Sequence, residues 1–244
     1  MTDDSIQASD VASWLRARPV APQLVIFDCD GVLIDSEPIA NRVTAAEITR
    51  LGYPISPAEC ADRFLGMSLA DMCEVIPVAL GVTLPAAWEH RLAAALVRAL
   101  AQEAVLIPGA EAALRGTSAL GLPWRVASNS GKAELAAKFA CVGLTALVAD
   151  RVWSAETVIA RGGRGKPAPD LFLAVAEAAG VAQAACLVIE DSQAGIRGAR
   201  AAGMACLGFC PPGAEAALVA AGAVPLHELG QLPDLLRLAL DGSR

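Results

Sequence analysis

The chain has 244 residues, of which 55% are hydrophobic, and its 26 acidic and 19 basic side chains give a formal net charge of −7. This length allows one large domain, or one domain that carries a smaller one, and the apolar share can fill a core. The acidic excess, without a cluster of Lys or Arg, argues against a general nucleic-acid binder, because phosphate backbones are held by such clusters.

Targeting and redox signals are weak in this sequence. The longest runs without a charged side chain, such as Val75 to Trp88, are shorter than the ~20 residues that a membrane-spanning helix needs. The first residues, MTDDSIQASDVASWL, carry acids where a secretory signal would be basic. Seven scattered cysteines and two histidines favour neither a zinc site nor a disulfide framework. We therefore expect a cytoplasmic protein with no membrane association.

Five short apolar runs predict buried strands, and most are separated by helical patterns. The expected strands are LVIFD (24–28), WRVAS (124–128), TALVAD (145–150), CLVIED (186–191) and ACLGF (205–209). The expected helices between them span residues 133–143, 169–180 and 193–203. Buried strands that alternate with helices are typical of an α/β fold with a Rossmann-like, doubly wound parallel sheet.

The pattern changes between the first and second strands. Residues 37–107 show no convincing strand and read as amphipathic helices over 39–52, 57–66, 68–81 and 86–104. A connection of this length is too long for a simple crossover. We therefore expect an inserted helical domain at 37–107, an α/β core formed by 23–36 and 108–244, and an N-terminal extension, 1–22, with an optional helix and tail.

The stretch FDCDGVLIDSE places Asp28 and Asp30 at the carboxyl end of the first strand, where parallel sheets place their ligand sites. Residues two apart in an extended chain point to the same side. Two neighbouring carboxylates are tolerable if a divalent cation neutralises one while the other is protonated or hydrogen-bonded. Gly31 then permits a sharp exit with positive φ. A helix cap or a turn is the alternative interpretation of this motif.

Two further segments add groups suited to an anion. VASNS ends the second strand with Ser128 and Asn129, so that a hydroxyl and backbone amides lie before the next helix. GRGKPAPDLF places Lys166 in a loop before a helix, but the segment is not a P-loop because Pro167 follows the lysine. An ordinary serine cap and a solvated lysine are the alternatives here.

IEDSQAG ends the fourth strand with Glu190 and Asp191, followed by Ser192 as the expected helix N-cap. This repeats the acidic end of the first strand. Two strands could thus deliver carboxylate oxygens to one Mg²⁺.

In this order, FDCDGVLIDSE, ASNS, GKPAPDLF and IEDSQAG resemble the four signature motifs of the haloacid dehalogenase superfamily, in its phosphatase branch with a helical cap. The resemblance runs from about Gln23 onward. It implies the strand order 5-4-1-2-3, with the first and fourth strands as neighbours.

The resemblance also implies roles. Asp28 is the nucleophile that becomes an aspartyl phosphate, and Asp30 is the general acid and base. Ser128 and the Asn129 amide hold phosphoryl oxygens, as does Lys166. Mg²⁺ is bound by the Asp28 carboxylate, the Asp30 carbonyl and Asp191, with Glu190 in or just behind that ligand set.

Two alternative functions remain open from the sequence. A sugar-phosphate mutase of the β-phosphoglucomutase type shares DGV and EDSQAG, but this chain has Ala40 and Leu69 where that family has His and Arg. A phosphorelay receiver also combines clustered Asp, Ser or Thr and Lys, but is about half this length. The segment RFLGMSLADM and the tail HELGQLPDLL resemble 6-phosphogluconate phosphatase-like proteins more than the mutases.

Substrate selection is expected to depend on the loop between two helices of the inserted domain. Arg63, Gly66, Met67 and Ser68 are the candidates to face the substrate. We expect a small phosphorylated metabolite, such as a sugar or sugar-acid phosphate, and a monomeric protein.

Overall fold

The computed structural model describes residues 8–64, 67 and 69–241. The chain forms two compact units, one from Met1–Leu33, Leu106–Asn129 and Asp150–Arg244, the other from Ile34–Val105 and Ser130–Ala149. The second unit thus includes residues 130–149 in addition to the helices between residues 37 and 103. The predicted domain boundaries remain a prediction.

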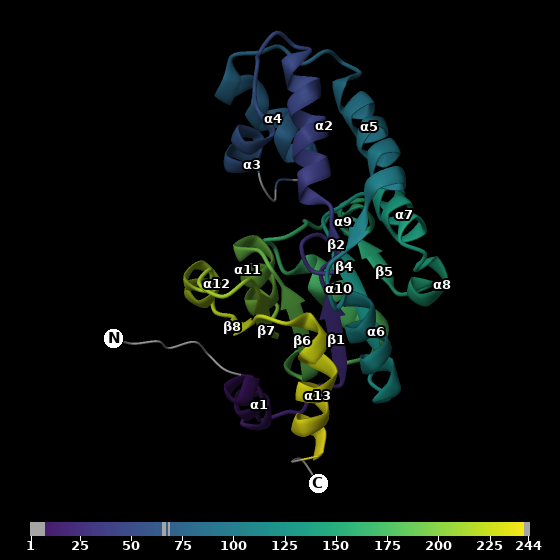
Figure 1. Cartoon of the computed structure of the whole chain (residues 1–244), viewed down its shortest axis with the longest axis vertical. Coiled ribbons are helices and arrows are strands. Elements are labelled where there is room, and N and C mark those ends of the chain that lie inside the picture. Colours follow the sequence, from purple (N-terminus) through teal and green to yellow (C-terminus); the bar gives the residue numbers. More distant parts are fainter. Residues whose placement is uncertain (1–7, 65–66, 68, 242–244) are drawn as a thin grey trace. The chain divides into compact units, whose positions relative to one another are not determined.

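The first unit is built on a parallel sheet of six strands in the order β5-β4-β1-β6-β7-β8 (Figure 1). The strands are β5 (Val152–Ser154), β4 (Trp124–Ser128), β1 (Leu24–Phe27), β6 (Cys186–Glu190), β7 (Ala205–Phe209) and β8 (Val224–Leu226). This confirms the predicted α/β fold class. The central strand order that the resemblance implies is present, and β8 extends the sheet at one edge.

One predicted strand is wrong. Thr145–Val148 forms the short helix α8, and β5 follows it at Val152–Ser154. A short apolar run fits a helix as well as a strand, so periodicity could not separate the two. In the folded chain most residues of the run are exposed, whereas a strand inside a parallel sheet is covered on both faces.

Helices cover both faces of this sheet. One face contacts α10 (Asp170–Ala179), α11 (Gln193–Ala201) and α12 (Ala216–Ala221). On the other face α6 (Ala110–Ala119) contacts β4, and α13 (Leu232–Asp241) packs against α6. The remaining short helices of the unit are α9 (Ala155–Ile159), η1 (Gln183–Ala185) and η2 (Leu229–Gln231). Alternation along β1 sends Leu24 and Ile26 into the core with α10 and α11.

The N-terminal helix α1 (Ala8–Arg16) belongs to the packing of this unit. It lies against α13, where Val11 and Leu15 are each 2% exposed. Arg16 Nε donates to Leu238 O over 3.0 Å. The sequence indicated an optional helix and tail, but its apolar face is buried.

The second unit is almost entirely helical. Its helices are α2 (Glu37–Thr49), α3 (Pro57–Phe64), α4 (Leu69–Leu80), α5 (Trp88–Glu103), α7 (Lys132–Cys141) and α8. They pack around buried side chains that include Ile48, Phe64, Ile76, Trp88 and Leu92. A two-stranded sheet, β2 (Ile34–Asp35) with β3 (Val105–Leu106), flanks the inserted helices in sequence, although no strand was predicted at 105–106.

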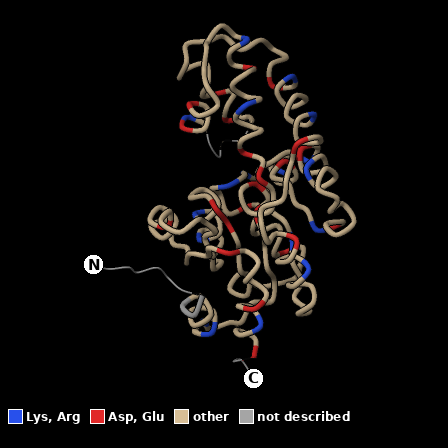
Figure 2. The backbone as a smooth tube through the Cα atoms, in the orientation of Figure 1, with Lys and Arg blue, Asp and Glu red and all other residues tan. Residues whose placement is uncertain are grey.

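Charged residues of both signs are interspersed along the chain (Figure 2). Among the helices described, none combines the length and the apolar character required to cross a membrane.

Candidate active site

The predicted site residues of the core meet at the carboxyl ends of three adjacent strands. β1 pairs with β4 on one side and with β6 on the other, and Phe27 lies in register with Val126 and Ile189. Asp28 follows β1 directly, Ser128 is the last residue of β4 and Glu190 is the last residue of β6. The sheet therefore brings together groups far apart in sequence.

Lys166 is the centre of this cluster. Its Nζ donates to Asp28 Oδ1 over 2.5 Å, to Glu190 Oε1 over 2.6 Å and to Ala127 O over 2.8 Å. An ammonium has three N–H donors, and all three are used. The Lys166 side chain is only 4% exposed. The loop lysine is thus a buried, fully hydrogen-bonded cation rather than a solvated one.

Glu190 ties that cation to the start of α11. Its Oε2 accepts from the backbone N–H of Asp191 over 3.0 Å and from that of Ser192 over 2.9 Å. The Ser192 hydroxyl donates to the same oxygen over 2.9 Å. Ser192 also accepts from Gly195 N, which confirms it as the N-cap of α11. Both oxygens of Glu190 therefore have partners within the protein.

Two glycines leave the space that these carboxylates occupy. Gly31 has φ +76°, as expected for a sharp exit from β1, and a Cβ there would lie 1.9 Å from Asp191 Oδ2. A Cβ at Gly195 would lie 1.7 Å from Glu190 Oε1. Any side chain at either position would displace a site carboxylate.

Ser128 at the end of β4 and Asn129 directly after it contribute three further hydrogen bonds. Ser128 Oγ donates to Asp30 Oδ2 over 3.0 Å. Asn129 bonds the backbone of Lys166 twice, because its Oδ1 accepts from Lys166 N over 2.9 Å and its Nδ2 donates to Lys166 O over 3.0 Å. No sequence signal predicted this use of the Asn129 side chain.

Burial and charge shift the protonation equilibria of the cluster. Burial raises the pKa of Asp28 to about 7; the Lys166 charge opposes this, while Glu190 and Asp30 add to it. Burial lowers the pKa of Lys166, but the Asp28 and Glu190 carboxylates outweigh that effect and raise it above its usual value. Near neutral pH Lys166 therefore remains charged, and the protonated and ionised forms of Asp28 are both populated.

The acidic residues fit a hard divalent cation. Asp28, Glu190 and Asp191 each offer an oxygen, and these oxygens all lie within 4.8 Å of one another. Carboxylate oxygens are the ligands that Mg²⁺ prefers. Asp30 is not in this group; its carboxylate takes the Ser128 hydrogen bond instead.

Two of the four expected substrate residues, Arg63 and Met67, are described, and both lie in the second unit. Arg63 is exposed in the last turn of α3, where its Nη1 lies 3.4 Å from Tyr53 Oη as a donor. Met67 is half-buried and packs against the apolar core of this unit. Gly66 and Ser68 lie outside the described residues.

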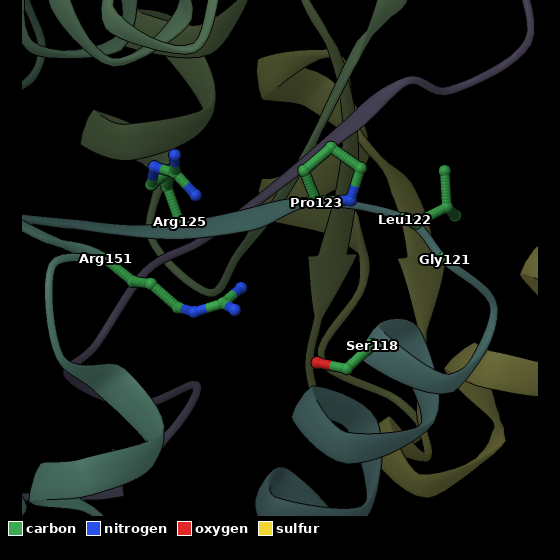
Figure 3. A pocket seen from close by; sticks show the side chains of 6 residues that line it. All are labelled: Ser118, Gly121, Leu122, Pro123, Arg125 and Arg151. Carbon is green, nitrogen blue, oxygen red and sulfur yellow. The ribbon is translucent and has the colours of Figure 1, made fainter.

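A separate hollow of about 310 Å³ lies beside the amino end of β4 (Figure 3). The acidic cluster, by contrast, lies at the carboxyl ends of β1 and β6. The Arg151 guanidinium lies 4.5 Å from the centre of the Trp124 ring beside the hollow. The residues that line the hollow are Ser118, Gly121, Leu122, Pro123, Arg125 and Arg151. None of these was predicted as a site residue.

Comparison with known proteins agrees with this geometry. A family model described as haloacid dehalogenase-like hydrolase matches residues 22–203. The 6-phosphogluconate phosphatase of Escherichia coli K12 is 30% identical over 214 residues, covering 87% of this chain and 94% of its own.

Two solved structures are also similar. A haloacid dehalogenase-like protein of unknown function from Agrobacterium tumefaciens is 36% identical with a TM-score of 0.73, covering 89% of this chain and 98% of its own. A family hydrolase from Deinococcus radiodurans, solved with bound phosphate and sodium, is 31% identical with a TM-score of 0.71, over 89% and 96% of the two chains. The chain therefore belongs to the haloacid dehalogenase-like hydrolase family, and it is a phosphatase-type enzyme of that family.

Proposed function

We propose that this enzyme hydrolyses small phosphate monoesters with Mg²⁺, through an aspartyl phosphate on Asp28. The observation that carries the proposal is the buried Lys166 ammonium, bonded to both Asp28 and Glu190 beside Asp191 at the ends of β1 and β6. Phosphoryl transfer depends chiefly on positioning and charge neutralisation, and this cluster provides both.

In the first step, an Asp28 carboxylate oxygen attacks phosphorus while the bond to the leaving oxygen breaks. Asp30 gives its proton to that leaving oxygen. In the second step, Asp30 takes a proton from water, whose oxygen attacks phosphorus and releases Asp28 and inorganic phosphate. Asp30 can serve in both directions because a single carboxyl can act first as acid and then as base.

Other groups hold the transferring phosphoryl group. The Ser128 hydroxyl and the backbone N–H of Asn129 follow β4, and Lys166 adds a positive charge beside the nucleophile. Preorganised donors of this kind act on charge that develops in the transition state.

Mg²⁺, held by Asp28, Asp191 and the Asp30 carbonyl, would supply the positive charge that lets an anionic carboxylate approach an anionic ester. Glu190 has partners on both oxygens, which favours a place just behind this ligand set. From there it would orient Lys166 and the start of α11.

A sugar or sugar-acid phosphate is the proposed substrate class. The support is the likeness to a protein named for 6-phosphogluconate. The mutase alternative is less well supported, since Ala40 in α2 and Leu69 in α4 replace the His and Arg that the mutase resemblance would require.

The test is a screen of phosphorylated sugars and sugar acids with Mg²⁺, run on the wild type and on Asp28→Asn. We expect release of inorganic phosphate that EDTA abolishes and that the substitution lowers by about 10³-fold or more. Unchanged turnover in Asp28→Asn would remove the proposed nucleophile. Isomerised sugar phosphate formed faster than free phosphate would support the mutase, and an aspartyl phosphate that persists for minutes would support a signalling role.

A further inference from the structure

We propose that the Asn129 side chain is a positioning residue that holds Lys166 in its catalytic place. The inference rests on the proposed function, in which Lys166 places a positive charge beside the nucleophile Asp28. It separates two roles of one residue: the Asn129 backbone amide faces the phosphate, and its side chain acts on the loop.

The contact is a two-point clamp. Asn129 Oδ1 accepts from Lys166 N over 2.9 Å, and Asn129 Nδ2 donates to Lys166 O over 3.0 Å. One carboxamide thus pairs with the donor and the acceptor of a single residue, much as a neighbouring strand would. The clamp fixes the backbone of Lys166 next to the end of β4.

The position of that backbone decides where the ammonium lies. Lys166 Nζ reaches Asp28 Oδ1 at 2.5 Å and Ala127 O at 2.8 Å. Ala127 lies in β4, two residues before Asn129, and Asn129 directly follows the end of this strand. The lysine is therefore held at its tip by Ala127 of β4 and at its backbone by Asn129, the residue that follows this strand.

Gly165 allows the clamp to close. A Cβ at this position would lie 2.7 Å from Asn129 Oδ1 and 3.2 Å from Ala155 Cβ. The chain can approach the carboxamide this closely only without a side chain at 165.

The same loop has a second anchor that does not touch Lys166. Arg164 N donates to Asp170 Oδ2 over 2.8 Å, at the start of α10. Asp170→Ala therefore loosens the loop without removing the clamp, and it serves as the matched control.

The experiment is a double-mutant cycle between Asn129→Ala and Lys166→Ala, with an aryl phosphate as substrate and Mg²⁺ present. Both substitutions keep the backbone groups. We expect Asn129→Ala to lower kcat about 10- to 100-fold, because small misplacements of a catalytic group have effects of this size. In the Lys166→Ala background the same change should have almost no further effect, because residues that act as one unit are not additive.

Affinity for inorganic phosphate, measured by calorimetry with Mg²⁺, gives a second cycle that does not depend on residual activity. Asn129→Ala should weaken phosphate binding in the wild type and leave it unchanged in Lys166→Ala. Asp170→Ala should have a much smaller effect than Asn129→Ala on both kcat and phosphate affinity.

Additive losses in both cycles would overturn the proposal, because Asn129 would then act independently of Lys166. An Asp170→Ala loss as large as that of Asn129→Ala would also overturn it, since general loosening of the loop would explain the effect. If instead Lys166→Ala retained full activity, the proposed function itself would fall. Thermal unfolding of each variant separates these outcomes from loss of the fold.

Discussion

Both units of the molecule bury a charged side chain, but they neutralise it in different ways. Lys166 in the first unit bonds to Asp28 and Glu190, whose side chains are 10% and 1% exposed. Glu47 in the second unit is equally buried, yet its partners Arg50 and Arg91 are 67% and 47% exposed.

The difference shows why a buried charge alone does not mark a catalytic site. The arginines around Glu47 lie between α2, α5 and solvent, and water can stabilise them if the carboxylate is lost. At Lys166 every partner is buried, so the charges depend on one another and on whatever ligand enters. Interdependent, desolvated charges of this kind are the ones that perturb pKa values at functional sites.

Lys166→Met should reduce activity and stability more than a substitution of Glu47. It removes the ammonium and leaves Asp28 and Glu190 facing each other, so we expect kcat to fall about 10²- to 10³-fold. The free energy of unfolding should fall by about 3 kcal/mol, as when one partner of a buried ion pair is removed. Steady-state kinetics and urea unfolding measure the two effects; a variant that keeps its activity would contradict the role given to Lys166.

Gly195→Ala should disturb the same cluster from α11. The backbone there is helical, and alanine favours a helix over glycine by up to about 1 kcal/mol. The new Cβ would nevertheless fall 1.7 Å from Glu190 Oε1. We expect a loss of about 10- to 100-fold in kcat with little change in circular dichroism, and undiminished kcat would show that Glu190 need not hold its observed position.

The raised pKa of Asp28 predicts proton release on Mg²⁺ binding. Burial raises this pKa to about 7, so the metal-free protein carries a proton there at lower pH, whereas a metal ligand must be ionised. Affinity for Mg²⁺ should rise with pH up to about 7 and then level off. Calorimetry in two buffers should detect a released proton at about pH 6 and almost none at about pH 8.5; equal release at both would contradict the assignment of Asp28.

The stability of the metal-free protein should fall as pH rises, whereas its affinity for Mg²⁺ should increase. A carboxyl whose pKa is raised on folding favours the folded state while it is protonated, and that contribution is lost as pH rises from about 4 to about 7. The Asp28→Asn variant should lack this part of the pH dependence.

Glu47→Gln should produce the smallest effect. Arg50 and Arg91 are exposed enough to be hydrated without their partner, so we expect the free energy of unfolding to fall by about 1 kcal/mol. The kcat should stay within about twofold of the wild-type value, which is about the spread of such measurements. A loss of activity comparable to that of Lys166→Met would remove the contrast between the two clusters.

The sequence was sufficient to predict much of this arrangement, because the key acids follow apolar strands whose carboxyl ends must meet at one edge. Asp28 and Glu190 are examples, because each lies at the end of a predicted strand. The run TALVAD was mistaken for a strand because six apolar-rich residues do not reveal which element they form. The Asn129 clamp could not be predicted from the sequence for another reason. It depends on the conformation of a loop that lies 37 residues away in sequence.

Trapping the covalent intermediate is the most direct test of the central claim. The enzyme would be mixed with a phosphorylated sugar acid and Mg²⁺, quenched in acid within the first turnover, digested and analysed by mass spectrometry. We predict one phosphoryl group on the peptide that contains Asp28, absent in Asp28→Asn. Phosphate released in a single turnover with no phosphoryl group on that peptide, at a rate that Asp28→Asn does not change, would contradict the account.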